Sequence, residues 1–235
     1  ALPDTLSWED IDEAFAGVSV DTALTHHAAA SSHDCGMNGP CALALGLVEG
    51  IESHSALVWD GGSIQIQTSA HEGSLAARWV LAIATRIAGA IDVPLHVIAE
   101  EDAVRASSLL SASDVGAIDL LQGVCENGPA VLAITDVSAL RSNLAEGLSI
   151  PQAEELWASL LGRARRAGIV IVAAYAGRFT SSTSAMGAFS MRLVRAREAN
   201  EALHAGLSPS DLRSLASGQA LLVRPGEPTV LACIP

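Results

Sequence analysis

Short runs that are apolar or contain β-branched residues alternate with helical patterns along the chain, and this alternation constrains the fold most. The runs cover residues 56–59, 63–67, 95–99, 130–135, 169–173, 191–194 and 220–223. Continuous apolar runs of this length are typical of strands that are buried on both faces, and intervening helices favour parallel pairing. The sequence therefore predicts an α/β fold with a largely parallel central sheet and helices on both faces.

Two helices between these runs have clear periodic patterns. From residue 74 to 88, Leu75, Trp79, Ile83 and Ile87 recur every four residues and form one apolar stripe. A second helix starts at Ser149, which has capping-box spacing to Gln152. Its last turn contains three arginines before Gly168, an ordinary helix stop that needs no functional role: Arg163, Arg165 and Arg166.

The first 41 residues have a different character from the rest. Ser7 and Asp10 have capping-box spacing ahead of Ile11, which predicts a leading helix within residues 1–16. Residues 17–41 are rich in Ala, Ser, His and Gly without periodicity, which is typical of a linker. We therefore expect a leading helix and linker over 1–41 and one α/β domain over 42–235.

Charge and composition exclude several function classes. The net charge of −13 comes from 26 acidic residues against 13 arginines, with no lysine, and such a surface disfavours autonomous binding to nucleic acid. The four cysteines are too few for a dense disulfide framework, so reduced thiols are expected. The chain starts without the basic and apolar stretches of a signal peptide, and residues 167–177 are too short to span a bilayer. We expect a cytosolic location and no direct membrane insertion.

A strand, a small-residue loop and a helix follow one another over residues 63–88, which is the layout of a phosphate-binding P-loop. Such a loop needs glycines whose N–H groups surround phosphate, a lysine, and a Ser or Thr for Mg²⁺. If Gly73 and Ser74 match the first two residues of a Gly-Ser-Gly-Lys-Ser/Thr motif, Leu75 stands at the second glycine. Ala76 then replaces the lysine and Ala77 the Mg²⁺ ligand, which removes the groups that stabilise phosphoryl transfer. An ordinary strand-to-helix turn explains these residues equally well.

The apolar run 130–135 ends in a single acidic residue, Asp136. In P-loop enzymes a strand of this kind carries the acid that positions the metal ion, often followed by a catalytic glutamate. Here Val137 follows instead. A helix N-cap is an equally good role for Asp136.

These segments, in their order along the chain, resemble the motor domain of FtsK/SpoIIIE translocases, and most of all the degenerate ATPase domains of the EccC component of type VII secretion. The resemblance covers about residues 42–235. It rests on residues 45–47, the helix after Gly73 and Ser74, the strand up to Asp136, and residues 165–174, 191–195 and 218–222. It implies a RecA-like P-loop fold. The family has a polar sensor residue after the strand at 169–173, whereas this chain has Ala173, Ala174 and Tyr175.

The resemblance implies a non-hydrolysing domain that serves as a structural or regulatory module in a protein-export translocase. The degenerate nucleotide cleft would comprise Gly73, Ser74, Leu75, Ala76, Ala77 and Asp136, with ATP and Mg²⁺ weakly supported as ligands. Expected partners are adjacent ATPase domains of the same, longer polypeptide and a signal segment of a secreted protein. The location implied is the cytoplasmic part of a membrane-anchored translocase. Two alternatives remain: an ATP-binding motor domain, as in DNA translocases, whose neighbour supplies the missing groups, and a peptide-binding module.

Three other residue sets suggest chemistry. Histidines and cysteines between residues 26 and 41 are suitable zinc ligands, although their spacing fits no standard finger: His26, His27, His33, Cys35 and Cys41. Ser69 or Ser74 could pair with His71 and Glu72 in a hydrolase, but no Gly-x-Ser-x-Gly elbow occurs. Arg178 is a weak candidate for an arginine finger acting on a neighbouring subunit, with a surface arginine as the simpler identity.

Overall fold

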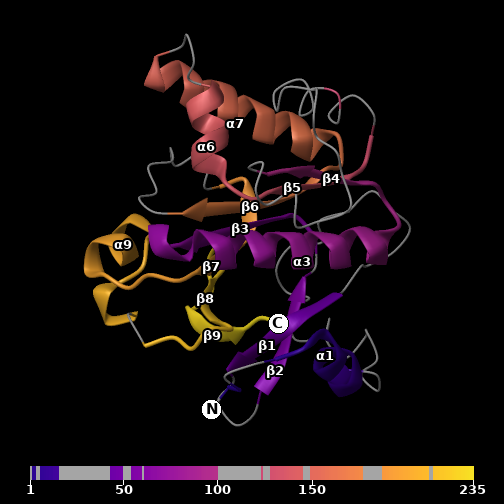
Figure 1. Cartoon of the computed structure of the whole chain (residues 1–235), viewed down its shortest axis with the longest axis vertical. Coiled ribbons are helices and arrows are strands. Elements are labelled where there is room, and N and C mark those ends of the chain that lie inside the picture. Colours follow the sequence, from indigo (N-terminus) through magenta and orange to yellow (C-terminus); the bar gives the residue numbers. More distant parts are fainter. Residues whose placement is uncertain are drawn as a thin grey trace.

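Nine strands within the described residues form one sheet, in the order β2-β1-β9-β8-β7-β3-β6-β5-β4 (Figure 1). The computed structural model describes residues 2–3, 6–15, 43–49, 54–59, 61–99, 123, 128–144, 149–176, 187–211 and 214–235. The strands are β1 (Leu43–Glu49), β2 (His54–Trp59), β3 (Ser63–Thr68), β4 (Leu95–Ile98), β5 (Val131–Ile134), β6 (Val170–Ala176), β7 (Phe189–Val194), β8 (Gln219–Val223) and β9 (Val230–Cys233).

The helices lie where the periodic patterns predict them, with additional short ones. They are α1 (Trp8–Phe15), α3 (Gly73–Ile91), α6 (Val137–Leu144), α7 (Ile150–Arg166) and α9 (Ala199–His204), with short 3-10 turns at η1 (Ala70–Glu72) and η2 (Pro209–Asp211). Both predicted capping boxes form: Ser7 exchanges hydrogen bonds with Asp10 before α1, and Ser149 with Gln152 before α7. Helix α7 ends as expected, since Gly168 adopts a left-handed φ of 73°.

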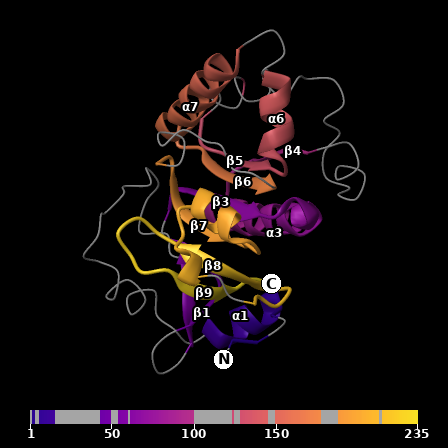
Figure 2. The ribbon, with the colours of Figure 1, turned by 90° about the vertical axis from the view of Figure 1, so that its left-hand side faces the viewer.

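Half of the sheet is parallel and the other half is antiparallel. Strands β4, β5, β6, β3 and β7 run parallel to one another, which confirms the predicted α/β fold. Strands β8, β9, β1 and β2 extend this unit through antiparallel pairs, an extension that the sequence patterns do not indicate. Figure 2 shows the parallel part above the antiparallel part, and the two meet where β7 pairs with β8.

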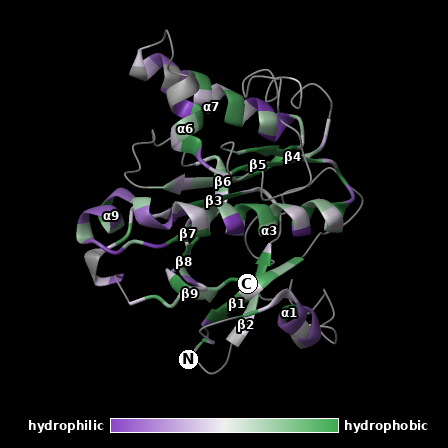
Figure 3. Ribbon diagram, viewed as in Figure 1, coloured by the Kyte–Doolittle hydropathy of each residue, from purple (hydrophilic) through white to green (hydrophobic). Residues whose placement is uncertain are grey.

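Alternate residues of the central strands face two different helical layers. Ile64, Ile66 and Val172 pack with the apolar stripe of α3 in one core cluster. Leu132, Ile171 and their neighbours pack with α6 and α7 in a second cluster. Because successive residues of a strand point to opposite faces, α3 covers one face and α6 with α7 covers the other. Figure 3 shows the apolar strands between these layers and the polar helices α1 and α9 at the periphery.

Helix α3 is the central helix of the fold. The stretch Ala70–Ile91 is long and apolar enough to span a membrane by length and composition alone. In this structure its apolar stripe, including Trp79, Ile83 and Ile87, is buried against the sheet. That arrangement is the one expected of the core helix of an α/β domain.

Candidate functional site

The turn between β3 and α3 lies at the carboxyl ends of the parallel strands, where α/β folds place their ligands. It consists of Ser69 and the 3-10 turn η1, closed by a hydrogen bond of 3.0 Å from the Glu72 N–H to the Ser69 carbonyl. Helix α3 then starts directly at Gly73, whose φ of −55° is already helical. The predicted strand, loop and helix are therefore present, and the loop is short.

The predicted cleft residues occupy the first turns of α3. Ser74 is exposed, whereas Gly73, Leu75 and Ala77 are half-buried. Ala76 is fully buried and belongs to the core cluster between α3 and the sheet. The five residues are thus contiguous on one helix, but they do not share one face.

Asp136 lies at the same edge of the sheet, directly after β5. Because β5 is parallel to β6, and β6 to β3, the carboxyl ends of β5 and β3 lie at one edge with β6 between them. The Asp136 carboxylate accepts hydrogen bonds from the N–H groups of Ser138, at 2.7 Å, and Ala139, at 3.2 Å. Asp136 is therefore the N-cap of α6, the simpler of the two roles considered for it.

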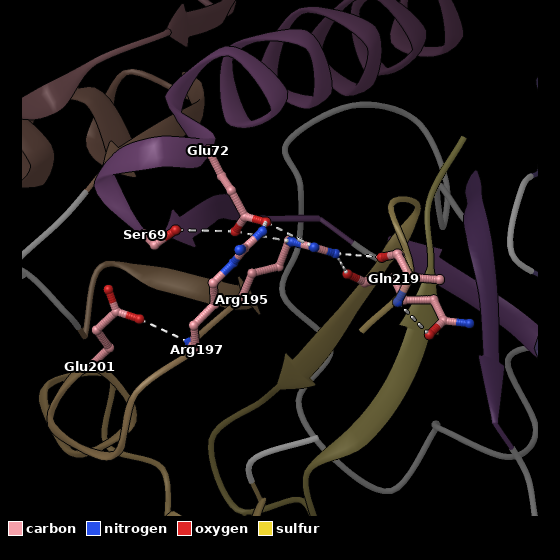
Figure 4. A network of polar contacts seen from close by, with 7 residues as sticks. Ser69, Glu72, Arg195, Arg197, Glu201 and Gln219 are labelled. Carbon is pink, nitrogen blue, oxygen red and sulfur yellow. Dashed lines mark hydrogen bonds and ion pairs between the residues drawn. The ribbon is translucent and has the colours of Figure 1, made fainter. Parts of the chain in front are cut away.

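A buried ion pair joins the β3–α3 turn to the segment after β7 (Figure 4). The Arg195 Nη2 atom lies 2.9 Å from Glu72 Oε1, and its Nε atom lies 3.3 Å from Glu72 Oε2, so the guanidinium binds the carboxylate with two parallel hydrogen bonds. Both side chains are buried, at 7% and 9% exposure. This two-point geometry is the strongest form of arginine–carboxylate contact.

Several fixed groups hold Arg195 in place. Its Nη1 atom donates to the carbonyl oxygens of Ala216, at 2.6 Å, and Gln219. Its guanidinium also lies over the Trp79 ring, 5.9 Å from the centroid, in a cation–π contact. The backbone N–H of Arg195 donates to the Gln67 carbonyl, which continues the ladder between β7 and β3.

A second guanidinium reaches the same carboxylate from the solvent side. The Arg197 Nη2 atom lies 2.7 Å from Glu72 Oε1, while the Arg197 side chain stays 64% exposed. Ser69 completes the set, because its hydroxyl donates to Glu72 Oε2 at 3.3 Å. Burial alone raises the pKa of Glu72, but the hydrogen bonds and charges of Arg195 and Arg197 outweigh it and lower the pKa below its ordinary value. Glu72 is therefore an anion at neutral pH.

The hydrolase alternative finds no support in this turn. Ser69 bonds to Glu72, and within the described part of the chain His71 forms no hydrogen bond with Ser69 or Ser74. No group of three or more metal-ligating side chains occurs among the described residues. The proposed zinc ligands between residues 26 and 41, and Arg178, lie outside the residues that the structure describes.

Sequence reasoning missed the most strongly bonded residues of this region. The sequence analysis included Arg195 only in a segment that resembles the family and Glu72 only as a possible acid of a hydrolase. It did not name Arg197. Arg195 and Glu72 are 123 positions apart, so no local spacing connects them. The available signal was an arginine directly after a buried strand, and an acid directly before a helix that starts with glycine.

Comparisons with solved structures identify the fold. A two-domain structure of EssC (ATPases 2 and 3) from Geobacillus thermodenitrificans superposes with a TM-score of 0.62 at 14% identity, over 83% of this chain and 44% of the other. The cytoplasmic domain of the type VII secretion ATPase EccC from Thermomonospora curvata gives 0.58 at 15% identity, over 84% and 26%. EccC (ATPases 2 and 3) from the same organism, in complex with a signal sequence peptide, gives 0.51 at 14% identity, over 99% and 43%.

The fold is thus that of a P-loop ATPase domain. Within that class it is the fold of the ATPase domains of EssC and EccC, as the sequence resemblance predicted. The chain spans less than half the length of these structures. No protein-family model matches the sequence, and no curated protein matches it.

Proposed function

We propose that this chain is a pseudo-ATPase domain, a structural or regulatory module of a translocase similar to those of type VII secretion. The β3–α3 turn carries this proposal, because it occupies the place of a phosphate-binding loop but contributes no cation of its own. The sequence contains no lysine anywhere. Without the charge that acts on the β- and γ-phosphates, phosphoryl transfer loses several orders of magnitude in rate.

The structure offers a second way to place the turn on a P-loop motif, and we favour it. Four residues lie between Thr68, the last residue of β3, and Gly73, the first of α3. The two glycines of the motif G-x-x-x-x-G-K-[ST] have the same spacing, so Thr68 would stand at the first glycine and Gly73 at the second. Ser74 then stands at the lysine and Leu75 at the Mg²⁺ ligand. Burial supports this register, because a lysine at Ala76 would enter the apolar core, whereas Ser74 is exposed. In either register the residues do not fit ATP·Mg²⁺.

Calorimetric titration with ATP·Mg²⁺ and a phosphate-release assay test the proposal on the purified chain. We expect no phosphate release above that of a heat-denatured sample, and no change on Asp136→Asn. This variant is a suitable control because it keeps a side-chain oxygen for the cap of α6. Turnover that scales with protein concentration, persists through a second purification and falls in Asp136→Asn would refute the proposal. Binding of ATP without turnover would retain the pseudo-ATPase and give it a structural ligand.

The chemistry of the surface favours protein export over DNA transport as the setting of this module. Two similar structures are two-domain ATPase assemblies, and another is described as a cytoplasmic domain. By analogy we propose that this domain packs against neighbouring ATPase domains on the cytoplasmic side of a membrane-anchored translocase. The net charge of −13 opposes contact with a nucleic-acid backbone.

A peptide-binding module is the second candidate function, because one of the similar structures contains a signal sequence peptide. Fluorescence anisotropy with a labelled signal sequence peptide, titrated against a scrambled peptide of the same composition, tests it. A saturable rise for the native order alone would support this function. Equal binding of both peptides, or none, would exclude it for the isolated chain.

A further inference from the structure

Two arginine side chains converge on one carboxylate at the β3–α3 turn. Oxygen Oε1 of Glu72 accepts from Arg195 at 2.9 Å and from Arg197 at 2.7 Å, while Oε2 accepts from Arg195 and from the Ser69 hydroxyl at 3.3 Å each. Two guanidinium groups and one hydroxyl directed at two oxygens form a donor set for an oxyanion in general. Glu72 supplies that oxyanion from within the chain.

The inner donor, Arg195, is positioned independently of the anion. Arg195 is anchored by the carbonyl oxygens of Ala216 and Gln219 and by the face of Trp79, so removing Glu72 leaves its guanidinium in the same place. The Arg197 side chain is exposed and covers the open side, while its backbone N–H donates to the Glu201 carboxylate at 2.8 Å. The site is therefore preorganised on the inside and reachable from solvent.

Glu72 belongs to the turn between β3 and α3, the turn that takes the place of a phosphate-binding loop in the proposed function. Glu72 immediately precedes the 19-residue helix α3, whose free N–H groups and dipole favour an anion. One polar group at the end of β3, next to this turn, has no partner of its own. The Thr68 hydroxyl, at 2% exposure for the residue, has no hydrogen-bond partner within the described structure, although buried hydroxyls are normally paired.

We propose that Arg195 and Arg197 form an oxyanion site for carboxylate or phosphate groups, of which the Glu72 side chain is the resident ligand. The domain thereby carries its own substitute for a bound phosphate, which closes the site to nucleotide. This inference rests on the proposed function for the location of the phosphate site. Its test uses no ATP, so the two can fail separately.

Removing the resident carboxylate should create binding of external anions. In Glu72→Ala the buried Arg195 guanidinium has no carboxylate partner, and space is left between the two guanidinium groups. We expect inorganic phosphate or acetate to raise the Tm of this variant relative to chloride at equal ionic strength. A concentration tenfold above Kd should give a shift of about 4 °C. If phosphate acts at lower concentration than acetate, the site prefers phosphate; the reverse order identifies a carboxylate site.

Three matched proteins complete the experiment. The wild type and Glu72→Gln should show no anion-specific shift, because a side chain of the same size fills the site in both. Adding Arg195→Met to Glu72→Ala should abolish the shift. If Glu72→Ala is recovered only unfolded, its refolding yield from urea in phosphate against chloride gives the same readout. An equal Tm shift in all four proteins, or no difference between phosphate, acetate and chloride in Glu72→Ala, would overturn the inference.

Discussion

At the scale of single residues, the buried Glu72–Arg195 pair joins the β3–α3 turn to the segment after β7. Taking two charges out of water is costly, and the two-point geometry with additional carbonyl acceptors compensates for that cost. The pair therefore tolerates the loss of neither partner, since the remaining charge would stay buried without a counter-ion. Arg197 differs because its side chain remains largely in water.

Arg195→Met should lower the free energy of unfolding by about 3 kcal/mol or more, because it leaves the Glu72 carboxylate without its main buried partner. Arg197→Ala should have a much smaller effect, since Glu72 keeps Arg195. Urea denaturation of the two variants beside the wild type measures both. Equal losses for the two arginines would mean that burial of Arg195 does not control the energetics of the site.

The lowered pKa of Glu72 predicts a specific dependence of stability on pH. A carboxyl group whose pKa is lower in the folded protein stabilises the fold above about pH 4.3, the ordinary pKa of glutamate, and this contribution is lost as the pH falls through the lowered value. The stability difference between wild type and Glu72→Gln should therefore be largest near neutral pH and shrink in acid. Thermal melts of both proteins from pH 7 to pH 3 test this, and a constant difference would contradict it.

At the scale of elements, the sequence predicts helices and strands that depend on local patterns. It does not predict pairings between strands that are far apart in the chain. The stripe of α3, the capping boxes before α1 and α7, and the apolar strands are local, and the structure confirms them. Strand β1 was not predicted as a strand, because Gly46 interrupts its apolar pattern at a bulge against β2. The antiparallel order of β8, β9 and β1 depends on pairings that no periodicity encodes.

Replacing each of two glycines by alanine should have opposite effects on stability, one through packing and one through helix propensity. A Cβ at Gly46 would overlap the carbonyl oxygen of Cys233 in β9, so Gly46→Ala should push β1 from β9 and cost about 3 kcal/mol. Gly89 is exposed within α3, and a methyl group added there would meet nothing within 4 Å. Gly89→Ala should therefore raise the free energy of unfolding by about 0.5–1 kcal/mol, because alanine favours the helix more than glycine does. Chemical denaturation gives both values, and a neutral Gly46→Ala would show that the two strands can separate without cost.

At the scale of the whole molecule, the leading segment packs on the domain. Helix α1 contacts β1, Ile11 is fully buried, and Arg86 of α3 pairs with Asp12 and lies over the Trp8 ring at 4.7 Å. The capping box predicts this helix, and the sequence analysis assigned it to a leading segment before a domain that starts at residue 42. Its contacts are with β1 and α3, far along the chain, so sequence spacing could not reveal them.

Ile11→Ala should therefore lower the stability of the whole domain by about 2–5 kcal/mol, as expected for truncating a buried aliphatic side chain. The exposed Glu13 of the same helix provides the control, and Glu13→Ala should change stability little. A single cooperative transition at lower denaturant concentration is the expected result for Ile11→Ala. A wild-type midpoint would show that α1 detaches without affecting the domain.

The first and last described segments of the chain touch each other. The Pro3 carbonyl accepts from the Cys233 thiol at 3.3 Å and from the Gln219 side chain at 3.4 Å, and Figure 1 places the N and C labels at the same end of the molecule. Hydrogen bonds therefore hold residues near the two ends of the described structure side by side. The same adjacency makes the fold suitable for circular permutation, with old ends joined by a short linker and new ones opened in a surface loop.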